Sequence, residues 1–85
     1  MSVKEQTVEF VRYVLNQICD DRSAIEVVSK DDERGTLVTI SVAEGDMGKL
    51  IGKDGQTIDA IRLLVRSLGS RENVKINLKV VDHQE

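Results

Sequence analysis

Two glycines three positions apart, with a lysine between them, are the residues of this chain best suited to bind a ligand. Gly52-Lys53-Asp54-Gly55 follows the aliphatic pair Leu50-Ile51 and precedes Gln56. Glycine permits backbone conformations that other residues avoid, and it removes side chains that would keep a ligand away. If a helix begins near Gln56, its free N–H groups and positive dipole end lie at the same place. This combination predicts a site for phosphate or another anion, to which Lys53 adds a mobile cation.

A bare G-x-x-G is a weak signal, and the alternative is a linker between two helices whose glycines only serve turn geometry. The surrounding residues favour a functional site, because Leu50-Ile51 comes immediately before the motif and Ile58 follows three residues after it.

Other kinds of chemistry find little support. A phosphate-binding P-loop needs G-x-x-x-x-G-K-[ST], but position 47 is Met47 and position 54 is Asp54, so nucleotide hydrolysis is rejected. His83 is the only histidine and is interpreted as a solvated tail residue. Cys19 is interpreted as a free buried cysteine. No Cys/His cluster fits zinc, and no nucleophile has an evident base. We therefore expect no enzyme, no metal and no cofactor.

Composition limits the chain to one small soluble domain. Its 85 residues are 40% hydrophobic and 32% charged, with a net charge of −3. The segment 49–66 carries four cations and two acids, so it is +2 and the rest is −5. The acidic balance argues against coating nucleic acid by charge alone. One cysteine, no secretory signal and no long apolar run predict a cytoplasmic protein without a membrane segment.

A first helix is predicted from about residue 3 to residue 19. Ser2 and Glu5 have the spacing of a capping box, and Asp20-Asp21 marks the end of the helix. Apolar residues recur between them at helical spacing, namely Val8, Val11, Leu15 and Ile18, with Phe10, Val14 and Cys19 widening the stripe.

Two strands around a polar turn follow this helix. Residues 24–29 are rich in β-branched side chains, and residues 29–35 form the turn. Residues 36–43 alternate, with Val38, Ile40 and Val42 on one face. The pattern predicts an antiparallel hairpin.

The remaining elements surround the glycine motif. Asp46 can cap a one-turn helix that ends near Ile51, and a second helix is predicted over residues 56–68 with Gly69 at its C-terminal cap. The alternation of residues 74–80 predicts a strand, and the crossover before it is long enough for parallel pairing. Residues 82–85 are predicted to fray. The inner face of the second helix is expected to carry Ile58, Ile61, Val65 and Leu68.

Aromatic residues discriminate among RNA-binding folds. Phe10 and Tyr13 are the only ones, and both lie on the first helix. Domains that stack bases on aromatic rings, such as RRM and OB folds, are therefore disfavoured.

Residues 50–58 resemble the I-I-G-x-x-G-x-x-I signature of KH domains. The resemblance implies an α+β type II KH fold, in which the elements follow the order α-β-β-α-α-β and the helices pack on one face of a three-stranded mixed sheet. It covers residues 1–85 as a single domain, with an ordered core of about 3–81. It is strongest to the stand-alone bacterial KH-domain RNA-binding proteins of the KhpA type. That family implies a role as a global RNA-binding protein or RNA chaperone in post-transcriptional regulation of cell elongation and division.

The resemblance also implies a site and partners. KH domains clamp about four unpaired nucleotides, with the loop on the sugar-phosphate backbone and the bases in an aliphatic groove. Residues 36–43 are expected to wall that groove. Asp54 would repel phosphate unless it points away or caps the second helix. We expect single-stranded RNA as ligand, and a homodimer or a heterodimer with a Jag/KhpB-type KH protein. The alternative is a dimerisation module with little RNA binding of its own. The residues predicted to bind RNA are Gly52, Lys53, Asp54, Gly55, Lys49, Ile51, Ile58 and Arg62.

Overall fold

A computed structural model describes residues 2–81 of the chain. Helix α1 spans Val3–Ile18 and begins with the predicted capping box. The backbone N–H of Glu5 donates to Ser2 Oγ (3.1 Å), and the backbone N–H of Ser2 donates to Glu5 Oε1 (3.4 Å). The helix ends at Cys19, whose side chain is buried and whose thiol is free. The first predicted helix is thus confirmed to within a residue.

The predicted antiparallel hairpin is confirmed, but its boundaries move. Strand β1 spans Glu26–Asp32 and strand β2 spans Gly35–Ser41. The polar residues 30–32, predicted as turn, belong to β1 because they pair with residues 35–37 of β2. Ladder hydrogen bonds satisfy backbone groups whatever the side chain, so a polar run on an exposed edge strand reads as a loop in the sequence.

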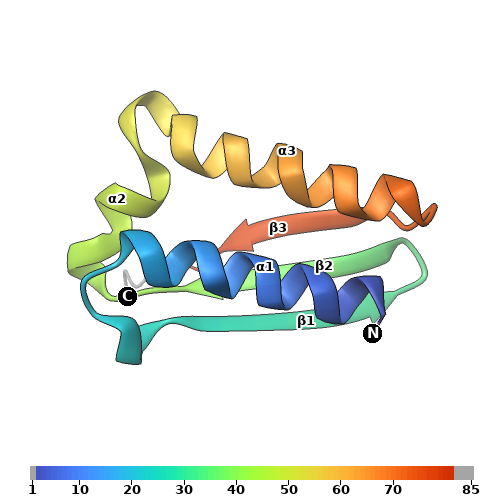
Figure 1. The fold of residues 1–85 in the computed structure, drawn as a ribbon, viewed down its shortest axis with the longest axis horizontal. Coiled ribbons are helices and arrows are strands. Elements are labelled where there is room, and N and C mark those ends of the chain that lie inside the picture. Colours follow the sequence, from blue (N-terminus) through green and yellow to red (C-terminus); the bar gives the residue numbers. More distant parts are fainter. Residues whose placement is uncertain (1, 82–85) are drawn as a thin grey trace.

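The crossover contains α2 (Met47–Ile51) and α3 (Gln56–Arg71), and it leads to β3 (Ile76–Val80). Strand β3 pairs parallel with β2, which gives a mixed sheet in the order β1-β2-β3. Figure 1 shows α1 and α3 on one face of this sheet, running in opposite directions. Helix α1 packs over β1 and α3 over β3. The type II KH fold predicted from the sequence is confirmed.

The core lies between this helical layer and the sheet. Val38, Ile40 and Val42 are fully buried, as the alternation of that segment predicts. Val11 and Leu15 of α1 and Val65 of α3 meet them from above. None of the helices in residues 2–81 combines the length and the apolar character that a membrane crossing requires.

The end of α3 corrects two predictions. The helix continues to Arg71, and Asn73 (φ 57°) takes the left-handed position just beyond it. The N–H of Val74 donates to Gly69 O (2.8 Å), and the N–H of Asn73 donates to Ser70 O (3.2 Å), which is a Schellman motif. Gly69 is thus three residues inside the helix, not at its cap. Leu68, predicted to face inward, is only half-buried.

The glycine at position 69 has a packing role instead. A Cβ there would lie 2.3 Å from Val74 O and 2.8 Å from a side-chain carbon of Ile76. Gly69 therefore lets the end of α3 approach the start of β3 closely. The predicted fraying of residues 82–85, and with it the interpretation of His83, lies outside the described residues.

Candidate functional site

The loop between α2 and α3 has a backbone that favours glycine at two positions. Gly52 has φ 76° and ψ 177°, and Gly55 has φ 77° and ψ 12°. Asp54 between them is also left-handed, with φ 55° and ψ 26°. Figure 1 shows this loop at the end of the molecule where α3 begins and α1 ends. The motif is therefore a tight, defined turn at the N-terminus of a long helix.

The two glycines are required for different reasons. A Cβ on Gly52 would lie 2.3 Å from Thr57 Oγ1 and 2.9 Å from the Thr57 backbone nitrogen. A Cβ on Gly55 would meet only Asp59 Oδ2, at 3.8 Å. Gly52 thus serves conformation and close packing together, whereas Gly55 serves conformation alone. Thr57 was not singled out in the sequence, because a threonine in a first helical turn is ordinary.

The N-terminus of α3 is left open by the side chains around it. Gly55 is the N-cap residue, and no side chain caps the helix. Asp54 was expected either to cap this helix or to point away from a bound phosphate. It does not cap the helix, and its side chain is exposed. Lys53 is also exposed, and it forms no ion pair within the described part of the chain. The N–H of Gln56 donates to Lys53 O, but no side chain caps the helix. N–H groups without a side-chain acceptor, the positive end of the helix dipole and the exposed Lys53 therefore belong to the same short segment.

Beside the loop, α2 is fastened to the end of α1. The Asp46 carboxylate is buried and accepts hydrogen bonds from the backbone N–H groups of Asp20 (3.1 Å) and Asp21 (3.0 Å). These two bonds hold the pKa of Asp46 below its usual value. Asp46 is the N-cap residue of α2, as the sequence predicts. Its carboxylate does not cap α2, however, but accepts from the residues that follow α1.

Lys49 joins the same cluster. Its ammonium pairs with Asp20 and lies 3.8 Å from Asp46 Oδ1. The hydrogen bond to Asp20 raises the pKa of Lys49. Burial, with Asp46 and Asp20 nearby, raises the pKa of the Cys19 thiol. Because Lys49 already pairs with Asp20, just after α1, it is a weaker candidate than Lys53 for binding an RNA phosphate.

Comparison with known proteins identifies the family. Residues 8–80 match the protein family described as "KhpA/KhpB, KH domain". The chain belongs to the KhpA/KhpB KH-domain family. It is 36% identical over 76 residues to the RNA-binding protein KhpA of Chlamydia trachomatis, covering 89% of this chain and 97% of that protein. It is 33% identical over 75 residues to the RNA-binding protein KhpA of Streptomyces coelicolor, covering 88% and 94%.

A solved structure agrees on the fold. A crystal structure of Era from Aquifex aeolicus superposes with a TM-score of 0.58 at 20% identity, covering 94% of this chain and 31% of that chain. At this identity the likeness concerns the fold alone.

The remaining predicted residues differ in burial and in their partners. Ile51 is half-buried beside the loop, whereas Ile58 is 4% exposed and belongs to the core. Arg62 lies on α3 and pairs with Asp59 (3.5 Å). The fold brings all eight predicted residues to α2, the loop and the first half of α3.

The segment expected to wall the groove, residues 36–43, contains most of β2. β2 is the central strand, and its helix-facing side chains, including Val38 and Ile40, are buried in the core. The expectation that residues 36–43 wall the groove stays a prediction. The strand at the free edge beside α3 is β3.

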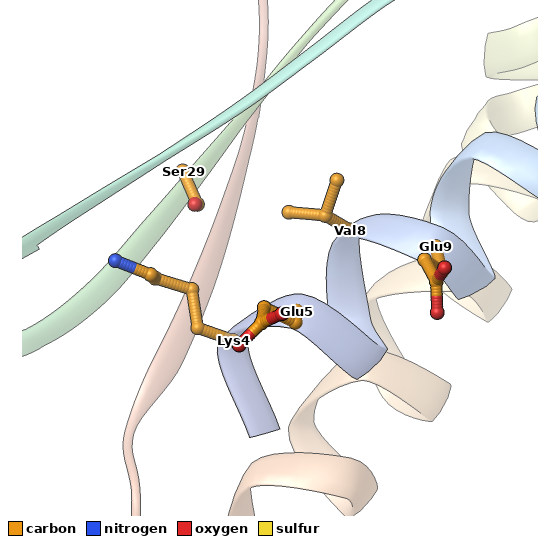
Figure 2. A pocket seen from close by; sticks show the side chains of 5 residues that line it. All are labelled: Lys4, Glu5, Val8, Glu9 and Ser29. Atoms are coloured by element: carbon orange, nitrogen blue, oxygen red, sulfur yellow. The ribbon is translucent and has the colours of Figure 1, made fainter. Parts of the chain in front are cut away.

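Another hollow lies far from the loop, between α1 and β1. Figure 2 shows its lining, Lys4, Glu5, Val8 and Glu9 of α1 with Ser29 of β1. Its volume is about 250 Å³. Two carboxylates oppose an anionic ligand here, and Lys4 is already paired with Asp31 (3.2 Å). The Thr36 hydroxyl and Lys4 lower the pKa of Asp31. This hollow is unsuited to RNA.

Within residues 2–81, no group of three or more histidine, cysteine, aspartate or glutamate side chains is arranged to hold a metal ion.

Proposed function

We propose that this chain binds single-stranded RNA, with Gly52-Lys53-Asp54-Gly55 and the start of α3 holding the sugar-phosphate backbone. The observation that carries the proposal is the uncapped N-terminus of α3 behind a glycine turn, with Lys53 exposed beside it. Backbone N–H groups and a single lysine can hold phosphate but carry no sequence information. Selectivity then comes from the aliphatic surface beside the loop, where Ile51 lies. The relatives called RNA-binding protein KhpA support this assignment and a role without catalysis.

The test is binding of short single-stranded RNA by the native chain and by Lys53→Asp, measured by fluorescence anisotropy. We expect salt-sensitive binding that the substitution largely removes while the circular dichroism spectrum is unchanged, because the altered side chain is exposed. Lys30→Asp makes the same charge change on β1 and should leave binding intact. Equal losses in the two variants, or equal binding by native and Lys53→Asp, would contradict the proposal.

A second proposal concerns a partner, and it rests on exposed apolar side chains of α3. Leu63 is 63% exposed and Leu64 50%. Leu64 also lines a hollow of about 210 Å³, with Phe10, Ser67, Leu68 and Arg71. Exposed leucines beside a partly apolar hollow are typical of an interaction surface. We propose that a second copy of the chain, or a Jag/KhpB-type KH domain, covers this face.

Two weak RNA sites on one assembly gain affinity through effective concentration. A gain in affinity from a second site matters here, because the negative charge of Asp54 offsets the positive charge of Lys53 in the loop. In this setting the protein acts in the cytoplasm as an RNA chaperone, in post-transcriptional regulation of cell elongation and division.

The partner proposal is tested with Leu64→Asp. A charge at the centre of an apolar interface is costly, so the variant should sediment as a monomer at concentrations where the native chain is a dimer. Val28→Asp introduces the same charge at another exposed apolar residue, on β1, and should not alter the mass. A native chain that is monomeric both alone and when mixed with a KhpB-type protein overturns this proposal and leaves the RNA proposal standing.

A further inference from the structure

The short helix α2 carries one side of the proposed RNA site, and it cannot hold its own position. It has only five residues, Met47–Ile51, whereas an isolated helix in water is marginal below about 12–15 residues. Its placement therefore depends on contacts with the rest of the chain. Leu50 supplies one contact, because its side chain is fully buried in the core. Apolar burial is non-directional, so it holds the helix down without fixing its angle.

The directional contact is the carboxylate of Asp46, which is 3% exposed. Its Oδ1 accepts from the N–H of Asp20 (3.1 Å) and its Oδ2 from the N–H of Asp21 (3.0 Å). Hydrogen bonds weaken steeply as their angles depart from the preferred range, so two of them on one carboxylate restrict rotation as well as translation. Lys49 of α2 also pairs with Asp20. The start of α2 is thus fixed to the residues that follow α1 (Figure 1).

The loop, by contrast, is fixed from the side of α3. Gly52 lies against Thr57, and the N–H of Gly55 donates to Gly52 O (3.3 Å). What depends on Asp46 is therefore the placement of the α2 side chains beside the loop, above all Ile51. Five residues of helix rise separate the two, about 7.5 Å, so a tilt of about 10° at Asp46 displaces Ile51 by about 1.3 Å.

We propose that Asp46 is a positioning residue for the base-binding half of the RNA site. By fixing α2 to the residues after α1, it places Ile51 and the aliphatic surface beside the loop at the depth that bases require. This inference rests on the proposed function. Asp46 is buried and acts through α2, so it does not itself contact RNA. Lys53 and the N–H groups of α3 give affinity for any strand, whereas Asp46 determines how much the bases add.

The experiment compares the four homopolymeric four-nucleotide RNAs with an abasic strand of the same length, which keeps the sugar-phosphate backbone. The ratio of the best RNA affinity to the abasic affinity measures what the bases contribute. Asp46→Asn should reduce this ratio about threefold to tenfold, the range for a residue that acts on a ligand through an intervening element. Its affinity for the abasic strand should stay native. A merely structural role changes the folded fraction, which scales both affinities alike and leaves the ratio unchanged.

Asp31→Asn is the matched control. It makes the same change at another hydrogen-bonded carboxylate, which accepts from the Thr36 hydroxyl (2.8 Å) and from Lys4 (3.2 Å). This carboxylate lies on β1, near the start of α1 and away from the loop (Figure 1). Because both variants remove one negative charge, the effect of net charge on RNA binding is the same in each. The control should keep the native ratio.

A measurement on the native chain needs no substitution. Coupling between two sites is reciprocal, so bases that bind α2 must also stabilise the bonds that hold α2 in place. Hydrogen exchange at the N–H groups of Asp20 and Asp21 should therefore slow more with the best RNA than with the abasic strand, each at saturation. The N–H of Arg34, which donates to Asp32 Oδ1 (2.7 Å) between β1 and β2, should respond equally to both.

The outcomes separate this inference from the function on which it rests. If the native chain binds no RNA, the proposed function fails and the role of Asp46 with it. If Lys53→Asp abolishes binding but native and Asp46→Asn have the same ratio, only the role of Asp46 is overturned. A native chain that binds the abasic strand as well as every RNA also overturns it, since no base contact then exists to be positioned. If Asp46→Asn does not fold, equal protection of Asp20 and Asp21 by RNA and by the abasic strand overturns it.

Discussion

The two long helices have the same length, 16 residues, but opposite N-termini. Ser2 and Glu5 close the start of α1 by accepting from each other's backbone N–H groups. Gly55 stands at the same position of α3 and offers no side-chain acceptor. The two starts lie at opposite ends of the molecule (Figure 1). The comparison separates two uses of one physical feature, since N–H groups that are capped stabilise the fold and N–H groups left open can bind a ligand.

A third set of N–H groups lies close to the open one. The backbone N–H groups of Asp20 and Asp21, just after α1, are both occupied by the Asp46 carboxylate. A carboxylate of the protein itself thus occupies the N–H groups of Asp20 and Asp21, whereas no side chain accepts from the N–H groups at the start of α3. The contrast between occupied and open N–H groups can be tested in three ways.

The largest effect is expected from the glycines that form the open site. Gly52→Ala should lower the free energy of unfolding by about 2–4 kcal/mol, because the backbone there is nearly glycine-only and the new Cβ meets Thr57. Gly55→Ala should cost only about 1 kcal/mol, since its Cβ has space and only the left-handed backbone opposes it. Urea denaturation of both variants measures the difference. Equal costs would mean that Thr57 does not pack against Gly52 in solution.

Asp46→Asn tests the occupied N–H groups. An amide can accept from one N–H but presents its own donor to the other, so Tm should fall. Because the folded pKa of Asp46 is lowered, its contribution is complete above about pH 4 and declines as pH falls through the folded pKa. The gap in Tm between native and variant should therefore be widest at neutral pH and should narrow in acid.

The control for the loss of the hydrogen bonds is Glu9→Gln, which alters an exposed carboxylate of α1 for which no hydrogen bond is found among residues 2–81. Its gap in Tm at neutral pH should be smaller than that of Asp46→Asn, because no buried hydrogen bond is lost. A gap for Asp46→Asn that widens in acid would contradict the predicted sign.

The smallest effect concerns the acid beside the open N–H groups. Asp54→Asn removes a negative charge next to the expected phosphate and keeps a residue that tolerates the left-handed backbone. RNA affinity should rise about twofold to fivefold, as expected for one exposed charge. Fluorescence anisotropy at low salt measures it, with Glu26→Gln on β1 as the control. A drop in affinity would show that the carboxylate helps to hold the ligand.

Local patterns in the sequence predicted the elements well, because they report local physics. The capping box predicted the start of α1, and the alternation of Val38, Ile40 and Val42 predicted the buried face of β2. The glycine motif predicted a turn whose backbone other residues avoid, and both Gly52 and Gly55 have positive φ.

The errors arise where a residue acts through a distant part of the chain. Gly69 looked like a helix cap, but it is fixed by its approach to Val74 and Ile76 after the turn. Lys49 looked like a free cation, but its partner Asp20 lies 29 residues earlier. Neither contact can be predicted from the spacing of residue types along the sequence.

The packing of Gly52 against Thr57 has a consequence for how fast and how selectively the loop works. A turn fixed by its own helix has its shape before any ligand arrives, so little ordering entropy remains to be lost on association. Encounter with RNA then requires no rearrangement of the loop, and association rates should vary little from one RNA to another. Discrimination among RNAs, wherever it arises on the surface, would appear in how long each one stays.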